Sequence, residues 1–341
     1  MVVCSSLLRA TVQPLLAIAL FLILWINIKD SFLFTNSLQA NQLIVEKELC
    51  PLVSPKLVGW TDLSLARTTA ILEQDEKIVE SEMRKAGVQD GGRYEPSECQ
   101  SRHKVAIVVP YRDRKKNLAI FLRYLHPFLQ RQQLSYMIIV VEQSGHLEVN
   151  RGMLRNIGFK EAQLLERFQC FIFHDVDFLP EDDRNPYTCP EDGKPRQMAY
   201  SIDYWDDYRP TPANHFGGVT ALSATDFQLV NGYSNAFWGW GGEDDQLYQR
   251  VLFHNLTVTR AVEDQPSLLH QVHYKTLPHP KEKPNPRRNR ILKAGSKRFK
   301  SDGLINLQYR RMALELKPLY TYVLVDIDDS SPAHWLEQKT Q

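Results

Sequence analysis

The chain has little glycine and proline and no excess of charge of either sign. Its 341 residues include 16 glycines and 19 prolines, which excludes collagen-like and low-complexity chains, and 43% are hydrophobic. The 41 basic and 40 acidic residues nearly cancel, so the chain lacks the basic field with which proteins hold nucleic acids, and we expect no nucleic-acid partner. The length suits two domains, or one large α/β domain behind a short appendage.

An uncharged stretch near the N-terminus predicts a membrane anchor. Residues 10–28 carry no charge. At about 1.5 Å per residue they reach ~28 Å, close to the ~30 Å core of a bilayer. A cleaved signal peptide is the alternative, but such peptides end at small residues, whereas Ile-Asn-Ile-Lys follows Trp25. Arg9 before the stretch favours a cytoplasmic N-terminus and a single-pass type II protein.

This anchor predicts how the rest of the chain is organised. The expected segments are a cytoplasmic tail 1–9, a transmembrane signal-anchor 10–28, a stem 29–49, a luminal domain 50–328 and a C-terminal tail 329–341. In an oxidising lumen four cysteines allow three disulfide pairings, with buried free thiols as the alternative: Cys50, Cys99, Cys170 and Cys189. Asn255 begins a glycosylation sequon, which is informative only if the domain is luminal.

Continuous apolar runs alternate with helical patterns in the first half of the predicted domain. The runs are 105–109, 137–141 and 170–173, and the helical patterns are 118–129 and 154–165. Strands buried on both faces have such runs, so the pattern predicts an α/β fold with a mostly parallel sheet. Ligands bind at the carboxyl ends of such strands. Four charged side chains follow these ends: Arg112, Arg114, Asp175 and Asp177.

The Asp175-Val176-Asp177 motif is a candidate metal site. Side-chain directions alternate along a strand, so both carboxylates project to one side, where a hard divalent cation could bridge them to phosphate. Arginines such as Arg112 and Arg114 fork onto phosphate oxygens. A structural set of salt bridges is the alternative.

Residues 235–245 combine two tryptophans, three glycines and three acids. Glycines permit large backbone changes, tryptophans cover sugar faces and acids act as bases, so the block predicts a closing lid joined to a catalytic carboxylate. A packed turn before an acidic helix N-terminus is the alternative. His270 and His273 are candidate metal ligands, with structural histidines as the alternative. Nine basic residues between 281 and 300 predict a solvated face or loop.

Several blocks between Cys50 and Ile327 resemble the β-1,4-galactosyltransferase family, which includes invertebrate β-1,4-N-acetylgalactosaminyltransferases. They are residues 91–96, 110–114, 173–177, 216–223, 238–245 and 301–304. The resemblance implies a GT-A type nucleotide-sugar-binding fold in a Golgi type II enzyme. Such an enzyme moves GalNAc or Gal from a UDP-sugar, with inversion and with Mn²⁺, in β-1,4 linkage to a terminal GlcNAc of a glycoprotein or glycolipid.

The resemblance also implies a role for individual residues. Asp244 would be the catalytic base, and Glu243 would orient the sugars. The implied donor-binding residues are Arg112, Arg114, Val149, Asp175, Val176, His215 and Trp240. The implied acceptor-binding residues are Gly242, Asp245 and Arg288, and the implied metal ligands are Asp177, His270 and His273. The implied disulfides are Cys50–Cys99 and Cys170–Cys189.

Three departures from the family pattern carry predictions of their own. His270 stands where most vertebrate members have the methionine of Met-x-x-His, which predicts tolerance of Mg²⁺. His215 stands where galactosyl enzymes have tyrosine, which favours UDP-GalNAc over UDP-Gal. Residues 284–291 form a shortened acceptor segment without its aromatic residue. The alternatives are a catalytically silent Golgi sugar-binding module and a xylose-directed galactosyltransferase.

Overall fold

The computed structural model describes residues 24–25, 28–29, 47–280 and 282–327. The chain divides into two units, Met1–Glu48 and Leu49–Gln341. The predicted tails 1–9 and 329–341 lie outside the described residues, as do most of the predicted anchor and stem. Among the described residues, no helix is both long and apolar enough to cross a bilayer. The elements below belong to the second unit.

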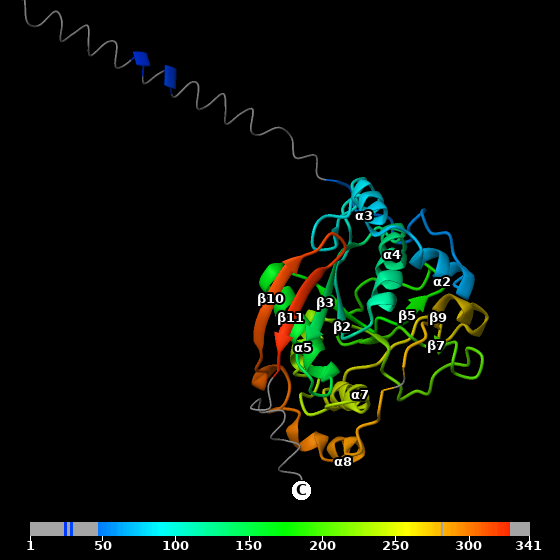
Figure 1. Cartoon of the computed structure of the whole chain (residues 1–341), viewed down its shortest axis with the longest axis vertical. Coiled ribbons are helices and arrows are strands. Elements are labelled where there is room, and N and C mark those ends of the chain that lie inside the picture. The colour runs from blue at the N-terminus through cyan, green and yellow to red at the C-terminus, as the bar shows by residue number, and fades with distance from the viewer. Residues whose placement is uncertain (1–23, 26–27, 30–46, 281, 328–341) are drawn as a thin grey trace, which may run out of the picture. The chain divides into compact units, whose positions relative to one another are not determined.

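A mixed sheet forms the centre of the second unit. Its strands run in the order β10-β11-β3-β2-β4-β8-β6, with β1 beside β3 (Figure 1). These strands are β1 (Arg93–Tyr94), β2 (Lys104–Tyr111), β3 (Ser135–Gln143), β4 (Cys170–His174), β6 (Arg196–Gln197), β8 (Val219–Ser223), β10 (Arg310–Leu316) and β11 (Thr321–Asp326).

The three apolar runs of the sequence form the central strands β2, β3 and β4. They pair in parallel with one another, and β11 joins them in parallel against β3. The outer pairs β10·β11, β4·β8 and β6·β8, and the β1·β3 pair, are antiparallel. The expectation of a mostly parallel sheet is therefore correct for the centre and wrong for the flanks. Their short strands come from segments that the apolar runs did not identify.

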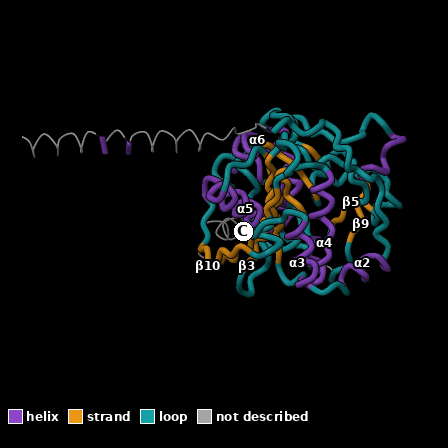
Figure 2. Tube along the Cα trace, turned by 90° about the horizontal axis from the view of Figure 1, so that it is seen from above, coloured by secondary structure: helices purple, strands orange, loops and turns teal. Residues whose placement is uncertain are grey.

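Helices cover both faces of the sheet. The α-helices are α2 (Leu65–Leu72), α3 (Glu76–Lys85), α4 (Lys115–Arg131), α5 (Arg151–Leu165), α6 (Ala224–Leu229), α7 (Glu243–Phe253) and α8 (Arg288–Lys293). Short 3₁₀ helices are η1 (Pro266–Val272), η2 (Gly295–Arg298) and η3 (Leu304–Asn306). Figure 2 shows α4 and α5 on opposite sides of the strands.

The two faces bury separate hydrophobic cores because side chains alternate along each strand. Ile107 of β2 packs in the core with α4, whereas its neighbour Val108 packs in the core with α5. Gly158 lets α5 approach the sheet closely, since a Cβ at this position would come within 3.0 Å of Val108 and 3.1 Å of Val141. The covered sheet explains why β2 and β3 are continuously apolar.

A small second sheet brings distant segments together beside the main sheet. Its strands, in the order β5-β9-β7, are β5 (Phe178–Pro180), β9 (His273–Thr276) and β7 (Ser201–Ile202). β5 directly follows the Asp-Val-Asp motif, so β9 brings residues 276–279 next to it. The structure also contains the two disulfides that the resemblance implied, Cys50–Cys99 and Cys170–Cys189.

Candidate active site

Acidic side chains from two elements meet at the carboxyl end of the central strands. Asp175 follows β4, and Glu243 and Asp244 open α7, whose N-cap Gly242 has a φ of 99°. Two arginines of α5 join the acids. Arg155 lies 2.7 Å from Asp175 and 3.4 Å from Glu243, and Arg151 forms an ion pair with each of the same two carboxylates.

The arginines decide the charge of Asp175. Burial alone would raise the pKa of Asp175, but Arg151 and Arg155 outweigh it and hold the pKa below its usual value. The pKa of Glu243 is raised, because burial and Asp244 outweigh the same two arginines. Burial and the neighbouring Asp245 also raise the pKa of Asp244. The site therefore holds one carboxylate whose pKa is lowered, that of Asp175, and two whose pKa is raised, those of Glu243 and Asp244.

Asp244 lies against the backbone of Gly217. A Cβ at position 217 would lie within 3.0 Å of Asp244 Oδ2 and 3.3 Å from its Cγ, so only glycine leaves space there for this carboxylate. Asp244 Oδ1 accepts a hydrogen bond of 2.9 Å from the backbone N–H of Asp245. A partly buried carboxylate of raised pKa, fixed on both sides, is suited to accept a proton.

Asp177 contacts His279 rather than the two histidines that the sequence singled out. Its Oδ2 lies 3.0 Å from His279 Nε2, and Arg114 lies 3.3 Å from the other nitrogen of that ring. The hydrogen bond to Asp177 raises the pKa of His279. His270 instead lies 3.4 Å from Arg184, and the ring of His273 stacks on Tyr208 at 4.1 Å.

The structure thus does not bring His270 and His273 to Asp177, as the prediction of a metal shared by Asp177, His270 and His273 requires. The cause is strand register: Leu277 N–H bonds to Asp177 O, whereas His273 O accepts from Glu181, four residues farther along. At about 3.3 Å per residue, this places His273 about 13 Å beyond the partner of Asp177. Among the described residues, no group of three or more His, Cys, Asp or Glu side chains is placed to hold a metal.

The tryptophan–glycine block rests on the predicted acceptor segment. Asn285 N–H bonds to Trp240 O at 3.0 Å, and Asn285 Nδ2 bonds to Trp238 O at 2.8 Å. Arg288 lies over the Trp240 ring at 5.4 Å, while Trp240 itself remains 45% exposed. An exposed tryptophan beside three acids is an arrangement suited to cover a sugar.

Comparison with known proteins shows the family to which the chain belongs. A model of the N-terminal region of glycosyl transferase group 7 matches residues 50–190, and a model described as the N-terminal domain of galactosyltransferase matches residues 196–274. Beta-1,4-galactosyltransferase 4 of Cricetulus griseus is 41% identical over 285 residues, which cover 83% of this chain and 78% of that protein. The chain belongs to the β-1,4-galactosyltransferase family.

A second relative and a solved structure are also similar to the chain. Beta-1,4-galactosyltransferase 1 of Bos taurus is 40% identical over 284 residues, covering 83% of this chain and 67% of that protein. The catalytic domain of Drosophila beta1,4galactosyltransferase 7, solved in complex with xylobiose, is 26% identical with a TM-score of 0.57 and covers 68% of this chain and 98% of that one. The fold is thus GT-A-like, and the chain is a glycosyltransferase.

His215 lies in an aromatic corner next to the acids. Its ring is 5.6 Å from that of Trp205, and its Nε2 is buried without a hydrogen-bond partner among the described residues. Burial and the positive charge of Arg260 lower the pKa of His215 to about 4. The imidazole is therefore neutral at neutral pH and has one ring nitrogen available for a hydrogen bond.

Three further predicted donor-binding residues and the predicted glycosylation site are also described by the structure. Arg112 donates to the backbone oxygen of Leu147 at 2.6 Å. Val149 is partly buried and accepts a hydrogen bond from Gly239 at 2.9 Å, and Val176 is buried. The sequon residue Asn255 is exposed in the turn after α7.

Sequence reasoning missed three residues of this site. They are Arg151, Arg155 and His279. The helical pattern predicted from the sequence begins at Leu154, so Arg151 lay outside it. The four-residue spacing that puts both arginines on one face becomes visible only because α5 begins at Arg151. Thr276 and His279 repeat the spacing of the Met-x-x-His pattern, with threonine in place of methionine.

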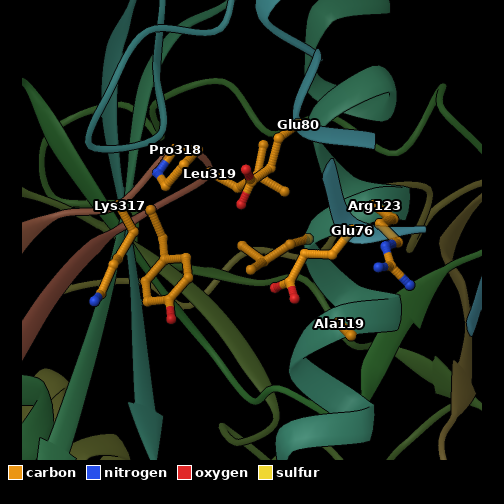
Figure 3. Close-up of a pocket in the computed structure, with 9 residues that line it drawn as sticks. Glu76, Glu80, Ala119, Arg123, Lys317, Pro318 and Leu319 are labelled. Atoms are coloured by element: carbon orange, nitrogen blue, oxygen red, sulfur yellow. The ribbon is translucent and has the colours of Figure 1, made fainter. Parts of the chain in front are cut away.

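A separate hollow of about 90 Å³ lies between α3, α4 and the β10–β11 turn. Figure 3 shows Glu76, Arg123 and Lys317 around it. It contains charges of both signs, and none of the predicted site residues lines it. The hollow is therefore distinct from the acidic site.

Proposed function

We propose that the protein is an inverting, metal-dependent glycosyltransferase that moves GalNAc or Gal from a UDP-sugar in β-1,4 linkage to a sugar acceptor. The observation that carries this proposal is the convergence of Asp175, Glu243 and Asp244 at one end of the sheet, next to the Asp177–His279 pair. A Golgi membrane location, which the family resemblance implies, is part of the proposal, with the catalytic domain in the lumen as the predicted anchor implies.

Asp244 is the proposed general base. Its carboxylate takes the proton of the acceptor hydroxyl as that oxygen attacks the anomeric carbon of the donor sugar. The bond from this carbon to the phosphate oxygen breaks, and UDP leaves with the bonding electrons. Attack opposite the leaving group converts an α-linked donor into a β-linked product. The raised pKa of Asp244 supports the role, because a more basic carboxylate accepts a proton more readily.

Asp177 and His279 are the proposed protein ligands of a divalent cation. A carboxylate oxygen and an imidazole nitrogen at 3.0 Å from each other are a donor set that suits Mn²⁺. When bound, such a cation neutralises the diphosphate leaving group. A mutant of the Drosophila relative was solved with manganese, UDP-Gal and xylobiose, which supports the same cation and donor class here. The prediction of Mg²⁺ tolerance rested on His270, which lies beside Arg184 rather than Asp177, so this arrangement gives it no support.

The donor sugar is proposed to be GalNAc in preference to Gal. The unpartnered Nε2 of the neutral His215 ring could bond to a 2-acetamido group, which UDP-GalNAc has and UDP-Gal lacks. The relatives named as galactosyltransferases favour Gal instead. The His215 ring therefore becomes the residue on which the choice of donor is tested.

The proposed acceptor is a terminal GlcNAc of a glycoprotein or glycolipid. A xylose acceptor is the second candidate, because the Drosophila relative was solved with xylobiose and because residues 284–291 depart from the family pattern. Arg288, Gly242 and Asp245 are the proposed acceptor-facing residues. A catalytically silent sugar-binding module is the third possibility that the assay below distinguishes.

The full chain, purified in detergent with Mn²⁺, tests the proposal. UDP release is measured with UDP-GalNAc and UDP-Gal, each with a GlcNAc-terminated acceptor and with a xyloside. We expect turnover with GlcNAc that Asp244→Asn abolishes. His215→Tyr should shift the ratio of donors toward UDP-Gal. No turnover with any combination would refute the enzyme and leave the binding module, whereas an unchanged donor ratio in His215→Tyr would refute the donor argument.

A further inference from the structure

Arg155 is a buried cation that no substrate-binding role explains. Its side chain is 2% exposed, and its guanidinium plane lies over the ring of Tyr233 at 5.0 Å. One terminal nitrogen pairs with Asp175 at 2.7 Å and the other with Glu243 at 3.4 Å. The two carboxylates come from different elements, the end of β4 and the start of α7, so Arg155, together with Arg151, links the two elements.

The pairing leaves one oxygen of Glu243 directed away from the arginine. Oε1 faces both Arg151 and Arg155, whereas Oε2 is buried and has no hydrogen-bond partner among the described residues. A buried carboxylate oxygen without a partner is costly, and it is the atom that a hydroxyl of a bound sugar would satisfy. Arg155 therefore holds Glu243 in the orientation that leaves this oxygen available.

We propose that Arg155 is a positioning residue for donor-sugar binding, which orients Asp175 and Glu243 through its fork. The proposal rests on the proposed function. Arg151 also pairs with both acids, but its side chain is 27% exposed and reaches Glu243 through Nε at 3.5 Å, whereas Arg155 is 2% exposed and gives each acid a terminal nitrogen. Arg155 thus acts through the two acids and does not need to touch the sugar.

The charges around Glu243 set the expected pH effect. Arg151 and Arg155 of α5 stabilise its ionised form, whereas Asp244 and Asp245 of α7 and burial oppose it, and Tyr233 lies nearby. Removing Arg155 leaves the opposing influences in place, so the pKa of Glu243 rises. If the ionised form is the active one, the acidic limb of the pH–rate profile moves to higher pH.

Two variants separate charge from geometry. Arg155→Met removes both, and we expect the shifted acidic limb in kcat/KM for the UDP-sugar. Arg155→Lys keeps the charge but cannot pair with both acids at once, so we expect a nearly normal limb with a donor KM raised about tenfold. Affinity for UDP with Mn²⁺, measured by calorimetry on the full chain in detergent, should stay within twofold of wild type in both, since Arg112 and Arg114 are the proposed nucleotide contacts.

The matched control is Arg196→Met. Arg196 is also partly buried. It donates to the backbone oxygens of Pro186 and Thr188 rather than to Asp175 or Glu243. Its loss should lower the melting temperature and leave the pH profile unchanged. If Arg155→Met folds, an acidic limb at the wild-type pH overturns the proposal. If it does not fold, Arg155→Lys decides, and a wild-type KM for the donor in that variant overturns the proposal. Loss of turnover in the wild type would refute the enzyme itself, which is a different result.

Discussion

The glycine beneath the proposed base offers the sharpest test of the site. In Gly217→Ala the new methyl group would lie within 3.0 Å of Asp244 Oδ2 and 3.4 Å from its Cβ. Gly217 does not have a positive φ, unlike Gly218 at 73°, so alanine is acceptable to the backbone. Non-bonded atoms settle at about 3.5 Å, so the carboxylate oxygen must move by about 1 Å. The end of a side chain can make this movement without unfolding the protein.

A base displaced by this distance should lose most of its effect. Misplacement by about 1 Å lowers rates about 10²-fold, so we expect kcat of Gly217→Ala to fall by about that factor. Stability, measured by thermal unfolding, should change little. Gly193→Ala is the control, because its Cβ meets nothing within 4 Å while its φ of 80° still strains the backbone. Full turnover in Gly217→Ala, or turnover lost only in step with unfolding, would refute the placement of Asp244.

Two further changes test the metal ligand and the core. His279→Ala should raise the Mn²⁺ concentration for half-maximal activity at least about 10²-fold, whereas His273→Ala should leave it unchanged. A metal titration with the opposite pattern would instead support His270 and His273, the ligands expected from the sequence. Gly158→Ala should lower the free energy of unfolding by about 1 to 3 kcal/mol in a denaturant titration, because the clash with Val108 exceeds the gain in helix propensity of about 1 kcal/mol. A stabilised Gly158→Ala would mean that α5 can lift from the sheet at no cost.

The parts of the fold that depend on local pattern were predictable from the sequence. Continuous apolar runs predicted β2, β3 and β4, and helical spacing predicted α4 and α5, because each pattern reports burial within one element. The short strands β6 and β7 have two residues each and carry no such pattern. Their pairing is decided by contacts between distant segments.

The residues of the site likewise include some that local sequence patterns identified and others that depend on contacts between distant segments. The Asp-Val-Asp motif and the block before α7 were recognisable as blocks, and their clustering follows from the sheet. His279 was not recognisable from the sequence. Residues 270–273 and 276–279 share one spacing, and only the register of β9 against β5 distinguishes them. Arg155 was also hidden: it follows the core residue Leu154 directly, on a helix whose residues are buried on nearly every side.

The attachment of Trp240 to Asn285 has a consequence for how such enzymes diverge. A backbone hydrogen bond and a β-bridge to Pro284 tie the tryptophan block to the proposed acceptor segment. A change of length in that segment must therefore shift the tryptophan as well. If residues 284–291 bind the acceptor and the tryptophan block covers the donor, as proposed, a change of acceptor specificity would also alter donor binding.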